Sequence, residues 1–119
     1  MKIRIRGNSV RFRLTQSEVK QLSDTGSVTS QTHFGERIFT YQVQTQEGID
    51  HLKASFQSAT ITLLLPKAWG QDWYTNPKVG FQNQDGALQL LLEKDFTCLD
   101  NRMEDESDNY PNPKQFANQ

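Results

Sequence analysis

The sequence predicts an α+β domain that is mostly β: an antiparallel sheet or a small barrel with two short helices. Residues 2–6 and 10–14 alternate apolar and charged side chains with a period of two, which is typical of half-buried strands. Two strand-like segments, which end at Leu14 and Leu65, are each followed by a short helical segment. The chain has 119 residues, of which 34% are hydrophobic, so it fits one domain with a thin core.

The first helix is predicted over about ten residues after Leu14. Thr15 and Glu18 have the spacing of a capping box, in which the threonine oxygen accepts a backbone N–H and the glutamate reaches back. Gly26 is suited to end this helix. Strands are expected over residues 27–34 and 37–44.

The second half of the chain repeats this order. Residues 49–56 are ambiguous between strand and helix, whereas residues 60–65 are typical of a strand. Pro66 suits the first position of a helix, which is expected over residues 67–74. The remaining expected elements are a strand that begins at Val79, a hairpin turn at Asp85-Gly86 and a last strand over residues 87–96.

Trp69 and Trp73 lie four residues apart, so they share one face of the second helix. Paired tryptophans can stack a sugar or a base, but large aromatic side chains more often serve burial. We therefore expect this pair to cover the core.

An internal ββαββ duplication is indicated by four apolar positions that recur 51 residues apart. It would divide a single β-rich domain, residues 1–98, into repeats over 1–48 and 49–97. The matched positions are Val10, Phe12, Leu14 and Leu22 in the first repeat, and Ile61, Leu63, Leu65 and Trp73 in the second.

Residues 99–119 read as an acidic tail with prolines and asparagines and few apolar side chains. The net charge of the whole chain is -1, yet the first 14 residues are basic and the stretch from Asp95 to Asp108 is acidic. This asymmetry predicts a tail that is docked, or partly docked, on the domain. Cys98 is the single cysteine, so an intrachain disulfide is excluded.

The candidate anion-binding residues are Arg4, Arg6, Arg11 and Arg13, which the period of two places with Lys2 on one face of a hairpin. In either register that the turn allows, Arg4 faces Arg11 or Arg13. Like charges directly opposite destabilise a sheet by about 0.2–1 kcal/mol per pair. Three interpretations stay open: a solvated basic face, a face neutralised by the acidic tail, and a face that receives an external phosphate, nucleotide or nucleic-acid backbone.

No other constellation predicts a site as directly. Cys98 would need His33 or His51 as a base, and neither is near it in sequence. Acidic residues near the carboxyl end could gather a hard cation, but their spacing matches no calcium loop. We therefore expect no metal and no cofactor. The residues of that cluster are Asp95, Cys98, Asp100, Glu104, Asp105 and Asp108.

Several segments together resemble a family of short bacterial proteins of unknown function. They are MKIRI at 1–5, SVRFRLT at 9–15, THF at 32–34, VGF at 79–81, EKDFTCLD at 93–100 and SDNYPNP at 107–113. The resemblance covers nearly the whole chain and implies that the tail belongs to the folded unit. It implies no activity, because the family has none assigned.

A weaker similarity is to the swapped-hairpin barrels of bacterial transition-state regulators and antitoxins. It is carried by residues 65–69, LPKAW, followed by Val79-Gly80, and by the duplication. Those proteins bind DNA through basic strands. This chain departs from them because it lacks net positive charge and carries an acidic tail, so nucleic acid is disfavoured as a partner.

These observations together predict a small cytoplasmic, non-catalytic binding or interaction module whose basic hairpin face accepts an anion. Its expected partners are the acidic tail, a phosphate-bearing ligand or a protein. No membrane partner is expected, since the longest apolar run is Leu63–Leu65. The alternatives are a small phosphate-handling hydrolase that uses a divalent ion with Asp95 and Asp100, and a tail-gated nucleic-acid binder.

Overall fold

The computed structural model of the chain describes residues 1–96. The predicted acidic tail and Cys98 lie outside the described residues. Within them, eight strands and two helices follow one another in the order expected for two ββαββ units. The elements are β1 (Lys2–Arg6), β2 (Ser9–Leu14), α1 (Gln16–Thr25), β3 (Ser27–Phe34), β4 (Arg37–Gln46), β5 (Lys53–Gln57), β6 (Thr60–Pro66), α2 (Lys67–Trp73), β7 (Gly80–Asp85) and β8 (Leu88–Lys94).

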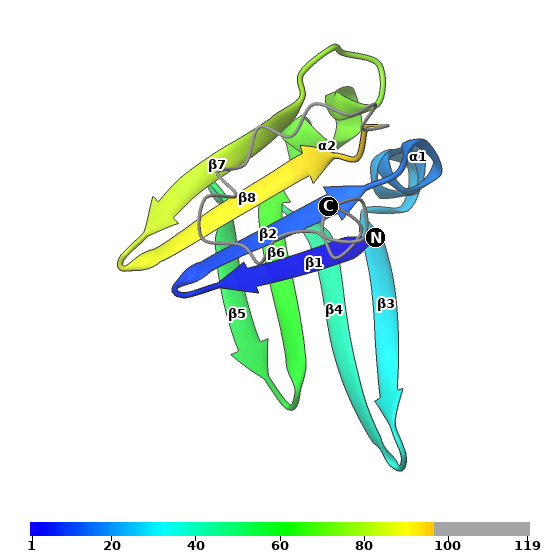
Figure 1. Cartoon of the computed structure of the whole chain (residues 1–119). Helices are drawn as coiled ribbons and strands as arrows, with labels where there is room; N and C mark the ends of the chain where they lie inside the picture. The colour runs from blue at the N-terminus through cyan, green and yellow to red at the C-terminus, as the bar shows by residue number, and fades with distance from the viewer. Residues whose placement is uncertain (97–119) are drawn as a thin grey trace, which may run out of the picture.

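The strands form two four-stranded sheets (Figure 1). Sheet A has the order β1-β2-β8-β7, and sheet B has the order β3-β4-β6-β5. The outer pairs of each sheet are antiparallel hairpins, whereas the central pairs, β2 with β8 and β4 with β6, are parallel. The predicted mostly-β α+β class with two short helices is confirmed. We expected one antiparallel sheet or a small barrel. The structure instead has two sheets, each of which mixes parallel and antiparallel pairs, and neither closes into a barrel.

The two halves exchange hairpins. Sheet A combines the first hairpin of the first half with the second hairpin of the second half, and sheet B combines the other two. An offset of 51 residues superimposes β2 on β6, where Phe12 and Leu63 are both fully buried. Their neighbours across the parallel pairs, Leu92 and Val43, are fully buried as well. The predicted ββαββ repeat is therefore present.

Helix α1 has the boundaries that its capping signals predict. The Thr15 hydroxyl accepts the backbone N–H of Glu18 at 3.4 Å, and the Glu18 carboxylate accepts the backbone N–H of Thr15 at 2.9 Å. Gly26 ends the helix in the left-handed conformation, with a φ of 84°, and its N–H donates to the Leu22 carbonyl at 2.9 Å. Val19 and Leu22 point into the core, so packing stabilises a helix too short to persist alone.

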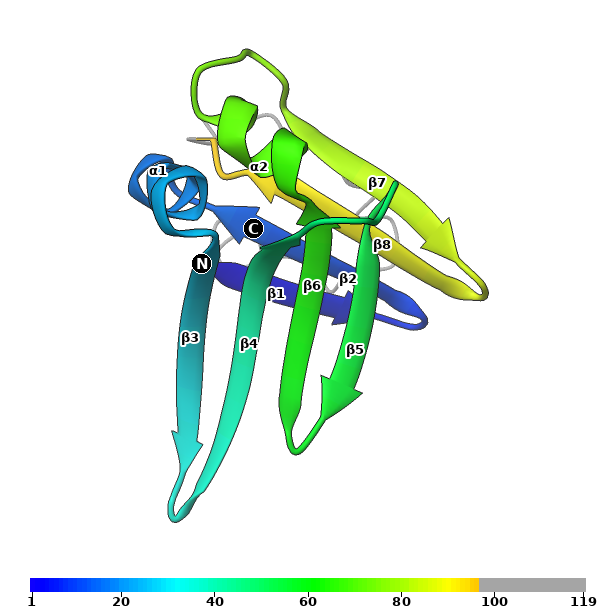
Figure 2. The same ribbon diagram turned by 180° about the vertical axis from the view of Figure 1, so that it is seen from behind.

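The core lies between the inner faces of the two sheets, and both helices lie together at one end of sheet B (Figures 1 and 2). The Ser23 hydroxyl of α1 donates to the Gln71 carbonyl of α2 at 3.0 Å. Trp73 is fully buried and Trp69 partly so, and the rings of both contact Phe81. The prediction that these tryptophans cover the core is confirmed.

Sheet B extends past sheet A. In both ribbon views the ends of the β3–β4 and β5–β6 hairpins project beyond β1 (Figures 1 and 2). Two aromatic side chains near these ends, Phe34 and Phe56, are 67% and 68% exposed. Part of an inner sheet face is therefore left uncovered by sheet A.

Candidate anion-binding face

The β1–β2 hairpin turns through two residues, Gly7 and Asn8. The turn fixes a register in which Arg4 lies directly opposite Arg11. Gly7 supplies the positive φ, 54°, that this tight turn needs. One of the two registers expected from the sequence is therefore observed, and it stacks cation against cation. The other cross-strand pairs on this face are Lys2 with Arg13 and Arg6 with Ser9.

All five cations share the outer face of sheet A. Residues at alternating positions, such as Phe12 and Leu14, point the opposite way and are fully buried. We call these five residues the basic face: Lys2, Arg4, Arg6, Arg11 and Arg13. The ladder extends the same outer face across β8 and β7, where Gln82, Gln84, Gln89, Leu91 and Glu93 continue its rows.

Two carboxylates among residues 1–96 pair with the basic face. The Glu93 Oε1 atom lies 3.2 Å from the Arg11 Nε atom and 3.6 Å from the Arg13 Nε atom. The Asp95 carboxylate lies 3.0 Å from the Lys2 ammonium. Among residues 1–96, two carboxylates therefore accompany the five cations of this face, and they pair with Lys2, Arg11 and Arg13.

Glu93 also fixes the two guanidinium groups of β2. Its Oε1 atom is shielded from solvent and, within the described part of the chain, accepts no well-aligned hydrogen bond. A buried carboxylate oxygen in this state needs its charged neighbours to remain close. The side chains of Arg11 and Arg13 are accordingly only 28% and 39% exposed. These two cations are therefore partly buried and share one acidic neighbour on β8.

The start of β1 is tied to helix α1. The amino group of Met1 pairs with the Glu18 carboxylate that also caps the helix. Burial raises the pKa of Glu18, but the hydrogen bonds from the Met1 ammonium and from Thr15 outweigh it, and the pKa falls below its ordinary value. This contact holds the end of the hairpin that carries Lys2 against the body of the domain.

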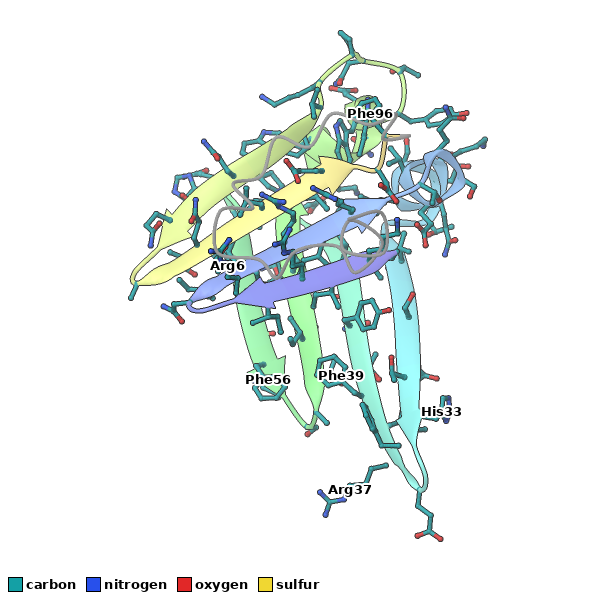
Figure 3. All side chains as sticks on the ribbon, in the orientation of Figure 1. Arg6, His33, Arg37, Phe39, Phe56 and Phe96 are labelled. Atoms are coloured by element: carbon teal, nitrogen blue, oxygen red, sulfur yellow. The ribbon has the colours of Figure 1, made fainter. Side chains whose placement is uncertain are left out.

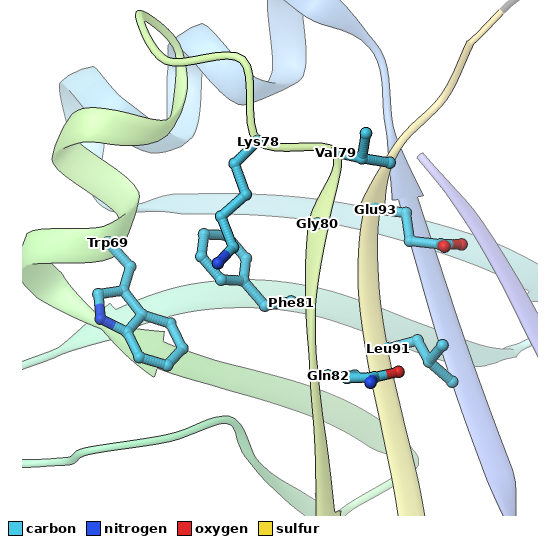
Figure 4. A pocket seen from close by; sticks show the side chains of 8 residues that line it. All are labelled: Trp69, Lys78, Val79, Gly80, Phe81, Gln82, Leu91 and Glu93. Carbon is cyan, nitrogen blue, oxygen red and sulfur yellow. The ribbon is translucent and has the colours of Figure 1, made fainter.

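A hollow of about 450 Å³ lies at the β7 edge of sheet A (Figure 4). On one side of the β7–β8 ribbon, Trp69 stacks on Phe81 with ring centroids 5.0 Å apart, and the Lys78 ammonium lies 5.2 Å from the Phe81 ring. On the other side lies Glu93, which is already paired with arginines. The polar side chains that line this hollow, Lys78, Gln82 and Glu93, do not converge on one point. Among the described residues, the hollow therefore has no pair of groups placed for acid–base catalysis.

A second hollow, of about 600 Å³, lies where β8 ends, and Asp95 and Phe96 line it. Asp95, a member of the alternative hydrolase site, is the Lys2 partner already described. Its proposed companion Asp100 lies outside the described residues, as do the other tail acids. Within residues 1–96, no three His, Cys, Asp or Glu side chains gather as metal ligands do.

The two histidines lie apart from both hollows. His33 is exposed on β3, near the tip of the β3–β4 hairpin (Figure 3), and His51 is exposed in the segment between β4 and β5. A pairing of either with Cys98 stays a prediction, since Cys98 falls beyond the described part.

Sequence reasoning missed the part that Glu93 has in this site. Glu93 reaches the arginines because β2 and β8 are parallel neighbours, with Arg13 directly beside Glu93. Local patterns do not report which distant strands pair. The one available signal was the alternation of Leu90 and Leu92, both buried, which directs Glu93 to the outer face.

The fold and the site define a class: a mostly-β α+β domain of two hairpin-exchanged sheets, one of which carries the basic face. The chain belongs to a family of unknown function (DUF7009), whose model matches residues 1–114. No curated protein and no solved structure matches it significantly. The comparisons therefore give no support to the similarity with swapped-hairpin regulators. Neither helix in the described part of the chain is long and apolar enough to cross a membrane.

Proposed function

We propose that the protein is a non-catalytic binding module whose basic face receives an anionic group. The observation that carries this proposal is the direct opposition of Arg4 and Arg11 in the β1–β2 hairpin. Opposed like charges weaken a strand pair unless an anion or solvent lies between them. An anion held by both guanidinium groups would turn this cost into binding energy.

The distribution of the other cations supports the same conclusion. Lys20 and Lys67, for example, each have a carboxylate of their own, at 2.6 Å and 3.1 Å. On the basic face Glu93 is shared by two arginines. Each guanidinium group is a planar fork of N–H donors, which can donate to two oxygens of one carboxylate or phosphate at the same time. The basic face thus brings four guanidinium groups together on two paired strands, an arrangement that favours anion recognition.

The ligand class follows from what accompanies the cations. No aromatic side chain shares the rows of the basic face within residues 1–96. Proteins that bind single-stranded nucleic acid stack bases on aromatic side chains, and the net charge of -1 gives no long-range attraction to a polyanion. These features favour a carboxylate-bearing or phosphate-bearing ligand over nucleic acid.

The test is the binding of fluorescein-labelled hexaglutamate to the full chain, measured by anisotropy at 50 and 300 mM NaCl. We expect Arg4→Gln with Arg11→Gln to weaken binding at least tenfold at the lower salt, because two charge-assisted contacts are lost. The matched control is Arg37→Gln with Lys53→Gln, two exposed cations of sheet B. Unlabelled tripolyphosphate, used as a competitor, tells carboxylate recognition from phosphate recognition.

Equal losses in the two double variants would contradict the proposal, as would binding that is insensitive to salt. A further arm examines the chain's own acids as a source of the anion. Neutralising the tail acids in the full chain raises the affinity for hexaglutamate if the tail occupies the face, and leaves it unchanged if the ligand is external. The five substitutions are Asp100→Asn, Glu104→Gln, Asp105→Asn, Glu106→Gln and Asp108→Asn.

A further inference from the structure

The uncovered end of sheet B has an apolar floor. The register puts Tyr41 and Phe56 in one row on the side that buries Val43 and Leu63. Phe39 lies two residues before Tyr41 in β4, on the same side of the sheet, and the two ring centroids are 6.1 Å apart. Figure 3 shows Phe39 and Phe56 on the part of sheet B that extends past β1. This floor is continuous with the core, but no strand of the described part of the chain lies above it.

Strand β1 forms the wall beside this floor. Among residues 1–96 it is an edge strand of sheet A, paired only with β2. Counted from the two-residue turn, hydrogen-bonded and non-hydrogen-bonded pairs alternate, so Ile3 and Ile5 direct their backbone N–H and C=O groups to the free edge. The Ile5 side chain faces the floor and is 57% exposed. An unpaired edge next to an exposed apolar surface is a site for strand addition.

We propose that β1 and this floor bind an extended partner peptide whose side chains alternate apolar and acidic. A strand added to β1 would continue sheet A over the uncovered end of sheet B. Its inward side chains would lie on Phe39 and Phe56. Its outward side chains would lie beside Lys2, Arg4 and Arg6. This inference rests on the proposed function, because the basic face supplies half of the recognition.

The chemistry of the chain's own edges disfavours a second copy as the occupant. Pairing of β1 with β1 of another copy would oppose cations again. The edge strands β3 and β5 contain no acidic residue, and β7 contains only Asp85, at its end. None of these edges would place a row of alternating carboxylates beside Lys2, Arg4 and Arg6. A heterologous peptide with alternating apolar and acidic residues satisfies both sides of the site.

The test compares two labelled eight-residue peptides of equal composition on the full chain. One alternates valine and glutamate, and the other has four valines followed by four glutamates. We expect the alternating peptide to bind at least tenfold more tightly. Phe56→Ser should weaken this binding about fivefold and leave hexaglutamate binding unchanged, because Phe56 lies on the floor. Val79→Ser is the matched control, since Val79 is 54% exposed and belongs to neither surface.

A second variant, Ile5→Pro, removes one N–H from the free edge and should also weaken the alternating peptide about fivefold, with thermal unfolding followed to confirm the fold. Equal affinity for the two peptides, or equal effects of the serine substitutions at Phe56 and Val79, would overturn the inference. If hexaglutamate still depends on Arg4 and Arg11 in that case, the proposed function stands and only the strand-addition site fails. Loss of that dependence contradicts both.

Discussion

Replacing Trp73 with alanine is expected to lower the free energy of unfolding by about 3–5 kcal/mol. The side chain is fully buried, and its indole N–H donates to the Lys78 carbonyl at 2.8 Å. Its ring meets the Phe81 ring edge-on at 5.1 Å. Helix α2 has seven residues and no side-chain cap at its start, so its stability depends on this packing. Chemical denaturation followed by far-ultraviolet circular dichroism measures the loss.

Tyr74→Ala is the matched control for this substitution. Tyr74 is the next residue along the chain and is 45% exposed. Its truncation should cost less than about 1 kcal/mol, as for most surface positions. If both alanine variants unfolded at the same denaturant concentration, the packing of Trp73 would not contribute the stability that its burial indicates.

Gly80→Ala is expected to destabilise the domain by about 1–3 kcal/mol. It is also expected to weaken anion binding at the basic face indirectly, through a shift of Glu93. A methyl group added at Gly80 would overlap the Leu92 carbonyl oxygen and would lie 3.0 Å from the Glu93 Cα atom. Both atoms are backbone, so β7 must move away from β8. Glu93 lies directly opposite Gly80, and it also holds Arg11. Thermal unfolding and hexaglutamate anisotropy together report the two effects.

Gln82→Ala, two residues further along β7 and on the same face, controls for the change of side chain. Gln82 is exposed, so its truncation leaves the strand spacing unchanged and should leave unfolding and binding close to those of the parent chain. A Gly80→Ala variant as stable as Gln82→Ala would show that the close approach of β7 and β8 is not required.

The elements with strong local signals were predictable from sequence. The Thr15–Glu18 capping box and Gly26 set the ends of α1, and the alternation of the first two runs set the faces of β1 and β2. The duplication was readable because the positions that it matches are core positions, as the burial of Leu22 and Trp73 shows. The helix ends and the strand faces depend on neighbours in sequence, and the duplication depends on a pattern that recurs along the chain.

The features that escaped prediction depend on distant or unusual contacts. Residues 49–56 were ambiguous because their apolar residues, Ile49, Leu52 and Phe56, have mixed spacing. The turn after β5 is made by Ser58 and Ala59, both at positive φ, 50° and 58°. Such turns normally carry asparagine or glycine, so this hairpin lacks the usual local turn signal. The parallel pairing of β2 with β8 follows from the exchange of hairpins between repeats. This pairing brings Glu93 to the arginines, and no local sequence pattern indicates it.

The most direct test of the anion-binding face is a nuclear magnetic resonance titration of the ¹⁵N-labelled full chain with hexaglutamate. We predict that the largest shifts fall on the backbone amides of β1 and β2 and on the Nε–Hε signals of Arg4, Arg6, Arg11 and Arg13, and that they saturate together. Shifts that spread evenly over the exposed cations, or that centre on Lys20, Lys67 or Arg37, would contradict it.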